Sequence, residues 1–238
     1  MKAAYRRILV KLSGERLAGE GGFGISPTVT ADIAQDLRDV HELGIQVCVV
    51  IGGGNVIRGI DAASQGLDRT SADYMGMLAS VINAMALQDA LEKQGLATRV
   101  LTALEISSVA EPYIRRRAER HLEKGRVVVF AGGTGNPYFS TDTAAALRAA
   151  ELGCEIILMA KQGVDGVYDS DPKLNTDAKR YEKLAFDEAI SRNLRVMDQT
   201  ALALCRENDI PIIVFDGAVA GNLQRVASGD RVGTLVGE

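Results

Sequence analysis

The amino-acid sequence predicts an α/β fold, a three-layer αβα sandwich built around a mainly parallel sheet. Short apolar runs alternate along the chain with segments whose apolar residues recur at helical spacing. Most of these runs are apolar at nearly every position, as in strands that are buried on both faces. Two of the runs end directly in glycine-rich loops, which in open α/β sheets lie at the carboxyl ends of strands. We treat residues 1–238 as one domain.

The apolar runs place the strands, and helical spacing with capping residues places the helices between them. Strands are expected at residues 5–12, 45–51, 97–101, 126–130, 154–159, 211–215 and 233–236. Helices are expected from Ser26-Pro27 to Gly44, at residues 71–94, 111–124, 144–152, 186–193 and 198–208, and from Gly221. The long helix at residues 71–94 has an apolar side that is either core or, in part, a subunit interface.

Composition excludes several classes of function. Hydrophobic residues make up 47% and charged residues 24% of the chain, and the net charge is −4, so nothing favours binding to nucleic acid or to a membrane. The opening residues run directly into a strand and no stretch approaches a membrane span, which predicts a cytoplasmic protein. Cys48, Cys154 and Cys205 lack metal-ligand spacing and are expected to be buried and reduced.

Residues 131–143 are where we expect the chemistry. They follow an apolar run and precede an alanine-rich helix, and they combine three glycines with Asn136 and the capping residues 140–143. Such a helix start favours an anion, so phosphate is the natural ligand. The alternative is a tight turn that binds nothing, and a second loop of the same kind, residues 52–55, weakens it. Neither loop has the spacing of a P-loop or of Gly-x-Gly-x-x-Gly.

Two residues and one segment elsewhere in the sequence could belong to the same ligand site as these loops. Lys11 stands at the carboxyl end of the first strand, where its ammonium suits a transferring phosphoryl group, although such a lysine alone is more often a surface residue. Arg58 follows the second loop by about one helical turn, and its guanidinium matches a phosphate. The extended segment 161–172 carries a lysine, Tyr168 and three acids, which could stack on a base and meet ribose hydroxyls or a metal shell.

Other polar residues receive no role. The arginines in the segment 115–120 could form a nucleic-acid patch, but their acidic neighbours favour a solvated face. His41 and His121 lie in charged helical segments, and we expect both to be solvated. Asp73, near the start of the long helix, either reads hydroxyl groups or helps to cap the helix.

The order of these features is that of a known family. The segments that carry the resemblance are Lys11-Leu12-Ser13-Gly14-Glu15, Gly52-Gly53-Gly54-Asn55, Asp73-Tyr74-Met75-Gly76-Met77, Thr134-Gly135-Asn136-Pro137-Tyr138-Phe139, Val164-Asp165-Gly166-Val167-Tyr168 and Arg195-Val196-Met197-Asp198. With them the chain resembles the amino acid kinase family nearly end to end. The Gly-Asn-Pro-Tyr-Phe loop together with Asp-x-Met-Gly-Met narrows the resemblance to the bacterial UMP kinases.

The resemblance implies an acceptor-binding lobe in the N-terminal part and an ATP-binding lobe in the C-terminal part. Catalytic roles are implied for Lys11, Asp142 and Lys161, although Lys161 lies one residue from the position where some relatives carry theirs. ATP contacts are implied for Lys11, Leu12, Ser13, Gly14, Gly54, Arg58, Gln162, Tyr168 and Asp171. Contacts with UMP are implied for Gly53, Asp73, Thr134, Gly135, Asn136, Pro137, Tyr138, Phe139, Ser140 and Thr141.

The implied reaction is the reversible transfer of the γ-phosphoryl group of ATP to UMP, giving UDP and ADP, in de novo pyrimidine nucleotide biosynthesis. The acceptor phosphate has a second pKa near ~6 and is largely a dianion at neutral pH, so no general base is needed. Mg²⁺ accompanies ATP, and no protein ligand is assigned to it. The family further implies a homohexamer built as a trimer of dimers, inhibition by UTP, and activation by GTP through Gly19, Glu20, Gly21, Gly22, Phe23 and Gly24.

Two rival functions remain at this point. A kinase that makes an acyl phosphate from a carboxylate has the same fold, but carries different acceptor loops. A non-catalytic nucleotide-binding or storage protein is the rival from another class, and the presence of Lys11, Arg58 and Asp142 argues against it.

Overall fold

The computed structural model describes residues 2–64, 66–172 and 174–237. Within these ranges nine strands form one sheet in the order β4-β3-β5-β2-β1-β6-β8-β9-β7. The strands are β1 (Arg7–Leu12), β2 (Gln46–Ile51), β3 (Thr98–Thr102), β4 (Glu111–Pro112), β5 (Val127–Ala131), β6 (Ile156–Lys161), β7 (Lys183–Leu184), β8 (Ile212–Asp216) and β9 (Thr234–Val236). Neighbouring strands are parallel except β8 and β9, which confirms a mainly parallel sheet.

Helices connect the strands. They are α1 (Gly14–Ala18), α2 (Pro27–His41), α3 (Gly59–Ser64), α4 (Arg69–Lys93), α5 (Arg115–Glu123), α6 (Thr141–Leu152), α7 (Phe186–Ser191), α8 (Gln199–Glu207) and α9 (Asn222–Ala227), with a 3₁₀ turn at Gly19–Gly21. Capping explains where two of them begin. Ser26 accepts the N–H of Val29 ahead of Pro27, and Ser140 accepts two N–H groups at the start of α6. No described helix is long and apolar enough to cross a lipid bilayer.

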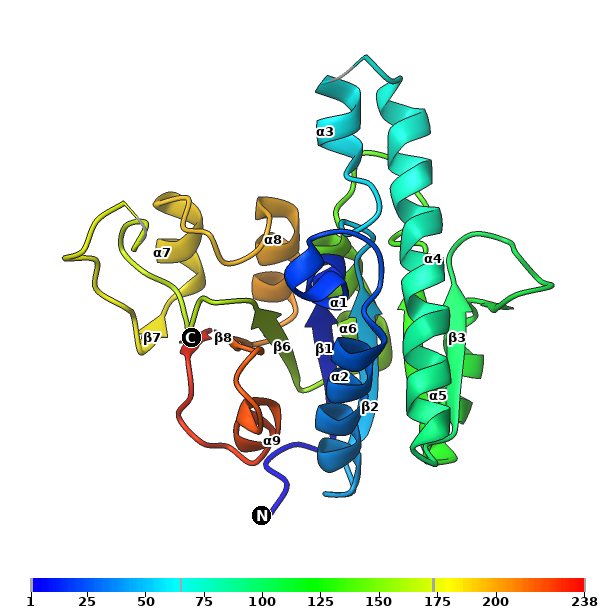
Figure 1. Ribbon diagram of the computed structural model, residues 1–238. Coiled ribbons are helices and arrows are strands. Elements are labelled where there is room, and N and C mark those ends of the chain that lie inside the picture. Colours follow the sequence, from blue (N-terminus) through cyan, green and yellow to red (C-terminus); the bar gives the residue numbers. More distant parts are fainter. Residues whose placement is uncertain (1, 65, 173, 238) are drawn as a thin grey trace.

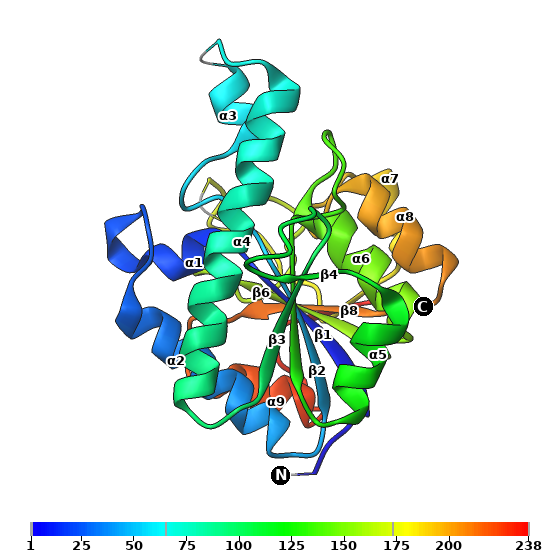
Figure 2. The same ribbon diagram turned by 90° about the vertical axis from the view of Figure 1, so that its right-hand side faces the viewer.

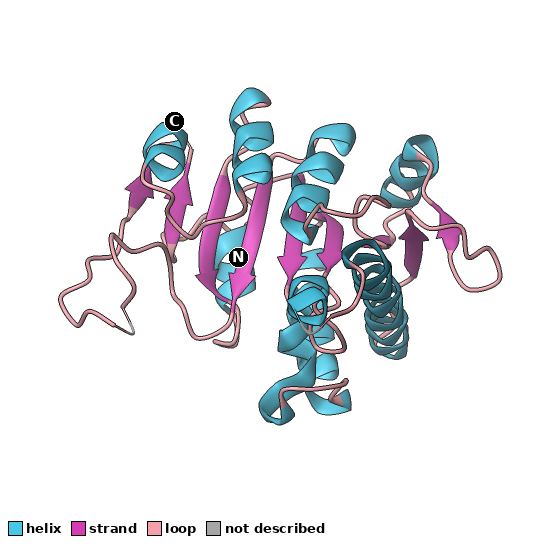
Figure 3. Cartoon of the chain, turned by 90° about the horizontal axis from the view of Figure 1, so that it is seen from above, coloured by secondary structure: helices cyan, strands magenta, loops and turns pink. Residues whose placement is uncertain are grey.

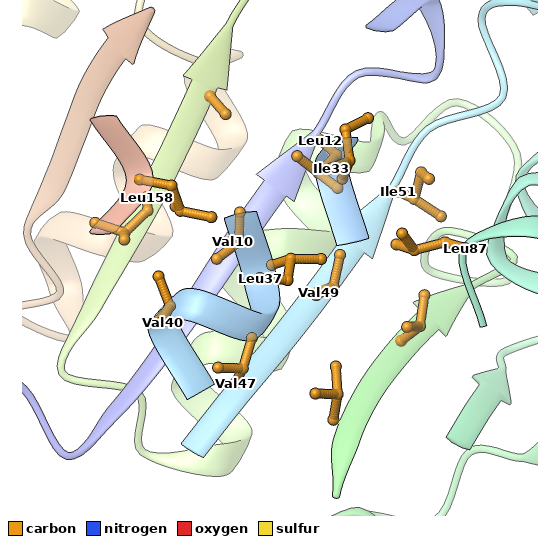
Figure 4. Close-up of a cluster of buried hydrophobic side chains, with 14 of the residues drawn as sticks. Val10, Leu12, Ile33, Leu37, Val40, Val47, Val49, Ile51, Leu87 and Leu158 are labelled. Carbon is orange, nitrogen blue, oxygen red and sulfur yellow. The ribbon is translucent and has the colours of Figure 1, made fainter. Parts of the chain in front are cut away.

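The sheet is the middle of three layers (Figure 2). Alternate residues of each strand point to opposite faces, so each face carries its own apolar cluster. On one face Val10 of β1 and Val49 of β2 pack with Leu37 of α2 (Figure 4), and α4 and α9 cover the same face. On the other face Leu9 and Val50 pack with α5, α6 and α8. Burying each such side chain contributes about 1.5–3 kcal/mol, so both helical layers are held firmly.

The carboxyl ends of β1, β2, β5 and β6 meet at one edge of the sheet. These four strands are adjacent and parallel, so the loops that follow them lie side by side. Beyond this edge rise α3 and the first turns of α4 (Figure 1), and the view from above shows helices on both sides of the strands (Figure 3). α3 and the first turns of α4 therefore form a wall on one side of this edge.

Several expectations were wrong in detail. The helix predicted from residue 111 begins only at Arg115, because Pro112 favours an extended residue before it and Glu111–Pro112 pairs with β3 as β4. His121 is not solvated: it is 8% exposed and its ring lies between Glu111 and Arg126.

Other expectations are confirmed. Cys48, Cys154 and Cys205 are buried and free. The arginines at the start and end of α5 are exposed and pair with acidic neighbours, Arg115 with Glu119 and Arg120 with Glu123, as expected of a solvated face.

Candidate active site

Lys11 and Asp142 form an ion pair at this edge of the sheet. Along β1 the residues Ile8, Val10 and Leu12 face α2, so Lys11 must face α6. Asp142 lies in the first turn of α6, where the helix dipole favours a carboxylate. The Lys11 ammonium is 2.6 Å from Asp142 Oδ1, and the two side chains are 14% and 19% exposed. A partly shielded ion pair therefore stands at the end of β1.

Lys161 brings a second ammonium group to this pair. It is the last residue of β6, one position beyond the Leu12↔Ala160 pair of β1 and β6, and alternation puts it on the same face as Lys11. Burial lowers the pKa of Lys161, the charge of Lys11 lowers it further, and Asp142 acts in the opposite direction. Two cations thus share one carboxylate, which leaves net positive charge for an anionic ligand.

Two glycine-containing loops touch beside the lysines. A Cβ on Gly14 would lie 2.6 Å from the Gly52 carbonyl oxygen, and a Cβ on Gly53 would lie 2.3 Å from the Gly76 carbonyl oxygen of α4. Both positions therefore exclude a side chain. The loop is anchored below by Asn83, whose amide donates to the Gly52 carbonyl at 2.7 Å and exchanges hydrogen bonds with Asn55.

Arg58 lies over this loop but is not free. Its guanidinium forms an ion pair with Glu15 at the start of α1, and the two side chains are 54% and 41% exposed. A Cβ on Gly54 would be 3.3 Å from Glu15 Oε1 and 3.5 Å from Arg58 Nε, so the ion pair spans the glycine. A phosphate arriving here would meet a guanidinium already held in place by a carboxylate.

The loop after β5 is fastened at both ends. In its middle the backbone N–H of Tyr138 donates to Asp73 Oδ2 at 2.8 Å. At its end the Ser140 hydroxyl donates to Asp198, the residue that caps α8, and the Thr143 hydroxyl lies 3.0 Å from the same carboxylate oxygen. The loop therefore joins α4 on one side to α8 on the other.

A cavity of about 740 Å³ lies between this loop and α4. Of the residues predicted to bind the acceptor, those that line it are Gly53, Asp73, Thr134, Tyr138, Phe139, Ser140 and Thr141. Gly54 and Arg58, which were predicted to contact ATP, also line this cavity and do not line the one on the β6 side. Gly135, Asn136 and Pro137 belong to the same loop but are not among the lining residues.

A second cavity of about 480 Å³ lies on the β6 side. Lys161, Tyr168 and Asp171 line it, whereas Gln162 does not. The Tyr168 hydroxyl donates to Asp165 Oδ1 at 2.6 Å, and this bond raises the pKa of Tyr168. Lys11 and Asp142 line neither cavity, but Thr141, next to Asp142 in the chain, lines the first cavity and Lys161 lines the second.

The other residues predicted for the site follow β1 in the chain, from Leu12 to Gly24. Leu12 is fully buried among the residues that face α2, so only its backbone can reach a ligand. Ser13 and Gly14 begin α1 beside the glycine loop. The segment Gly19 to Gly24 is attached to that loop through Asn55, whose amide donates to the Gly24 carbonyl at 2.6 Å, and Phe23 is 73% exposed.

Sequence reasoning gave no role to four residues of this site. Arg69 contacts Asp73, Glu15 contacts Arg58, Ser80 accepts the N–H of Gly132, and Asp198 holds the loop end. The spacing of Arg69 and Asp73, four residues apart in a helix, is the one signal that could have revealed a pair. The other three contacts join residues at least 43 positions apart.

No group of three or more metal-ligating side chains is found in the ranges that the structure describes. Mg²⁺ in phosphoryl-transfer sites is usually held by one or two carboxylates together with substrate phosphates and water. The carboxylate at this site, Asp142, already neutralises Lys11. The donor set therefore fits an ion held mainly by the phosphates of a nucleotide.

The fold and the site define a class of α/β proteins that bind phosphorylated ligands in a crevice at the carboxyl ends of parallel strands. Residues 6–216 match the model of the amino acid kinase family. The chain belongs to this family, as the sequence motifs indicated.

Solved structures narrow the comparison. UMP kinase from Bacillus anthracis is 43% identical with a TM-score of 0.95, over 98% of this chain and 96% of that one. UMP kinase from Ureaplasma parvum is 40% identical with a TM-score of 0.93, over 98% and 99% of the two chains. Uridylate kinase from Archaeoglobus fulgidus is 29% identical with a TM-score of 0.74, over 96% and 99%.

Proposed function

We propose that this protein is a UMP kinase, which transfers the γ-phosphoryl group of ATP reversibly to UMP. The observation that carries the proposal is the charged centre of Lys11, Asp142 and Lys161, because Thr141 beside it lines the first cavity and Lys161 lines the second. Similarity at 40–43% identity to two UMP kinases supports the choice of UMP as the acceptor. In this proposal the acceptor enters between α4 and the loop after β5, and ATP lies on the β6 side.

The first cavity suits a nucleoside monophosphate. Its volume of about 740 Å³ is within the range of small-molecule sites. Arg58 and the N–H groups of the glycine loop supply positive charge at one end for the phosphate. Asp73 supplies an acceptor for a ribose hydroxyl, and Thr134 with the lining residues 138–141 faces the base. The residues that line this cavity can therefore bind the phosphate, the ribose and the base of UMP.

The second cavity is assigned to the adenosine part of ATP. Tyr168 offers an aromatic face to the base, and Asp171 offers a carboxylate to the ribose. Ser13 and Gly14, at the end of β1, lead the phosphates toward Lys11. Gln162 lies outside the lining residues, so its proposed contact requires the loop after β6 to close over the nucleotide.

The chemistry needs charge and alignment rather than a base. The UMP phosphate is already a nucleophilic dianion at neutral pH. Lys11 and Lys161 neutralise the charge that spreads over the transferring group, and Asp142, which attracts both ammonium groups, holds them beside each other. Mg²⁺ bound to the ATP phosphates supplies further positive charge there.

Regulation and assembly complete the proposal. The attachment of Gly24 to Asn55 supports a role of the Gly19 to Gly24 segment in activation by GTP, since it links that segment to the glycine loop of the site. We also propose inhibition by the end product UTP and assembly into a homohexamer, a trimer of dimers.

The test is ADP formation from Mg-ATP with UMP, CMP, dUMP and N-acetylglutamate offered separately, each with and without GTP. The proposal expects turnover mainly with UMP and a change in rate on adding GTP. Turnover only with the carboxylate would favour an acyl-phosphate kinase, and no turnover with any acceptor would favour a nucleotide-binding protein.

A further inference from the structure

Arg69, the first residue of α4, contacts two walls of the proposed UMP cavity at once. Its Nε lies 3.0 Å from Asp73 Oδ1 and 2.9 Å from Asp73 Oδ2. Its guanidinium carbon is 5.3 Å from the centre of the Tyr138 ring, within the range of a cation–π contact. Because Asp73 also accepts the N–H of Tyr138, the three residues touch pairwise across the cavity wall.

Asp73 has little freedom within this arrangement. Its side chain is 13% exposed, and a Cβ on Gly59 would lie 2.1 Å from its Oδ1, so the backbone at the start of α3 packs directly against the carboxylate. Among the described residues the guanidinium of Arg69 is the cation that neutralises it. Removing Arg69 would leave a largely shielded carboxylate with the N–H of Tyr138 as its remaining partner.

Tyr138 also needs support. Its φ of 69° lies in the left-handed region, which a residue with a side chain seldom adopts. The Tyr138 ring meets Arg69, and its N–H meets Asp73, so both halves of the residue are held from α4. Arg69 therefore fixes the acceptor loop as well as the carboxylate.

We propose that Arg69 is the positioning residue for ribose recognition at this site. An ionised carboxylate has room for about four hydrogen bonds, and Arg69 and Tyr138 already fill three of these positions on Asp73, so Asp73 can still accept one ribose hydroxyl while they hold it in place. The inference rests on the proposed function, because it assigns a part of the same cavity. It predicts that discrimination between ribose and deoxyribose acceptors depends on a residue that itself touches neither hydroxyl.

The test compares wild-type protein with Arg69→Gln in steady-state kinetics with UMP, dUMP and ATP. We expect KM for UMP to rise about tenfold, as for loss of a charge-assisted bond, with kcat within about threefold and KM for ATP unchanged. The preference for UMP over dUMP in kcat/KM should fall at least about threefold. Lys93→Gln is the matched control, since it removes an i,i+4 ion pair at the far end of the same helix.

A double-mutant cycle separates positioning from a general structural role. If Arg69 acts through Asp73, the variant with both Arg69→Gln and Asp73→Asn should bind UMP no worse than Asp73→Asn alone. Independent effects that multiply would overturn the inference. So would an Arg69→Gln variant that weakens UMP and dUMP equally, or one that raises KM for ATP together with a lower melting temperature.

The two proposals fail in different ways. If the wild-type protein does not turn over UMP, the proposed function is wrong and the kinetic comparison has no basis. If the wild-type protein prefers UMP, and the Arg69→Gln variant keeps the wild-type KM for UMP and the wild-type preference for UMP over dUMP, only the role of Arg69 is wrong.

Discussion

Lys11 bears most directly on the proposed transfer, because its ammonium forms the charged centre of the site with Asp142 near the end of β1. Lys11→Ala should lower kcat by about 10²–10³, the cost of losing one preorganised charge that acts in the transition state. The fold should persist, since the lysine lies at the solvent edge of the sheet. Turnover and thermal unfolding measured on the same sample check this. Lys93→Ala is the control, and near-normal turnover of Lys11→Ala would remove Lys11 from the mechanism.

Because of Lys161, the rate of the reaction should fall at alkaline pH. Its pKa is lowered by burial and by Lys11, and the charged form is the one proposed to act. Activity should therefore be lost as pH rises through this lowered pKa, below the ordinary lysine value of about 10.4. The alkaline limb of kcat/KM against pH, which reports the free enzyme, measures it.

Lys161→Arg tests the assignment of that limb. Arginine keeps its charge throughout the accessible range, so the limb should move to higher pH in this variant even if the rate falls. An unchanged limb would mean that another group titrates.

At the scale of elements, Asp198 joins the starts of two helices. Its carboxylate accepts the N–H of Ala201 as the cap of α8 and also accepts the hydroxyls of Ser140 and Thr143 at the start of α6. Asp198→Ala should cost about 2 kcal/mol and lower the melting temperature by roughly 4–8 °C. Asp68→Ala is the control, because Asp68 caps only α4 and should give a smaller change. Equal shifts would mean that the link between α6 and α8 contributes nothing.

The long elements were predictable because periodicity and caps mark them. The strand β1 and the helix α2 are examples, since an apolar run defines one and Ser26 with Pro27 begins the other. The helix α1 and the strands β4 and β7 escaped prediction because five, two and two residues are too short to show a period. The strand β7 forms only because β9 lies beside it.

The site could be predicted in part for a similar reason. Lys11 and the glycine loops follow from where apolar runs end, which is a local property of the sequence. The burial of His121 by Glu111 and Arg126, and the contact of Ser140 with Asp198, depend on how distant segments pack. Residue spacing carries no signal for such contacts, so they emerge only from the folded chain.

At the scale of the whole molecule, α4 has an apolar face that no described residue of this chain covers. Val81 and Leu91 are buried, but five other apolar side chains of the helix are at least 42% exposed. They are Tyr74, Met75, Leu78, Ile82 and Met85. Their spacing places them along one side of the helix, and a contiguous exposed patch of this kind favours a protein interface. From the sequence, the apolar side of this helix could be either core or, in part, a subunit interface. We infer that its exposed part is an interface between subunits.

Charge placed on this face should break the assembly. In a two-fold interface each residue recurs on the partner, so Leu78→Glu with Ile82→Glu would bring four carboxylates into an apolar contact. The mass in solution, measured by light scattering, should fall from that of an oligomer toward that of a single chain. Val219→Glu is the matched control, because Val219 and Ile82 are both 51% exposed and Val219 lies away from α4. A double variant that keeps the wild-type mass would show that subunits, if they assemble, meet elsewhere.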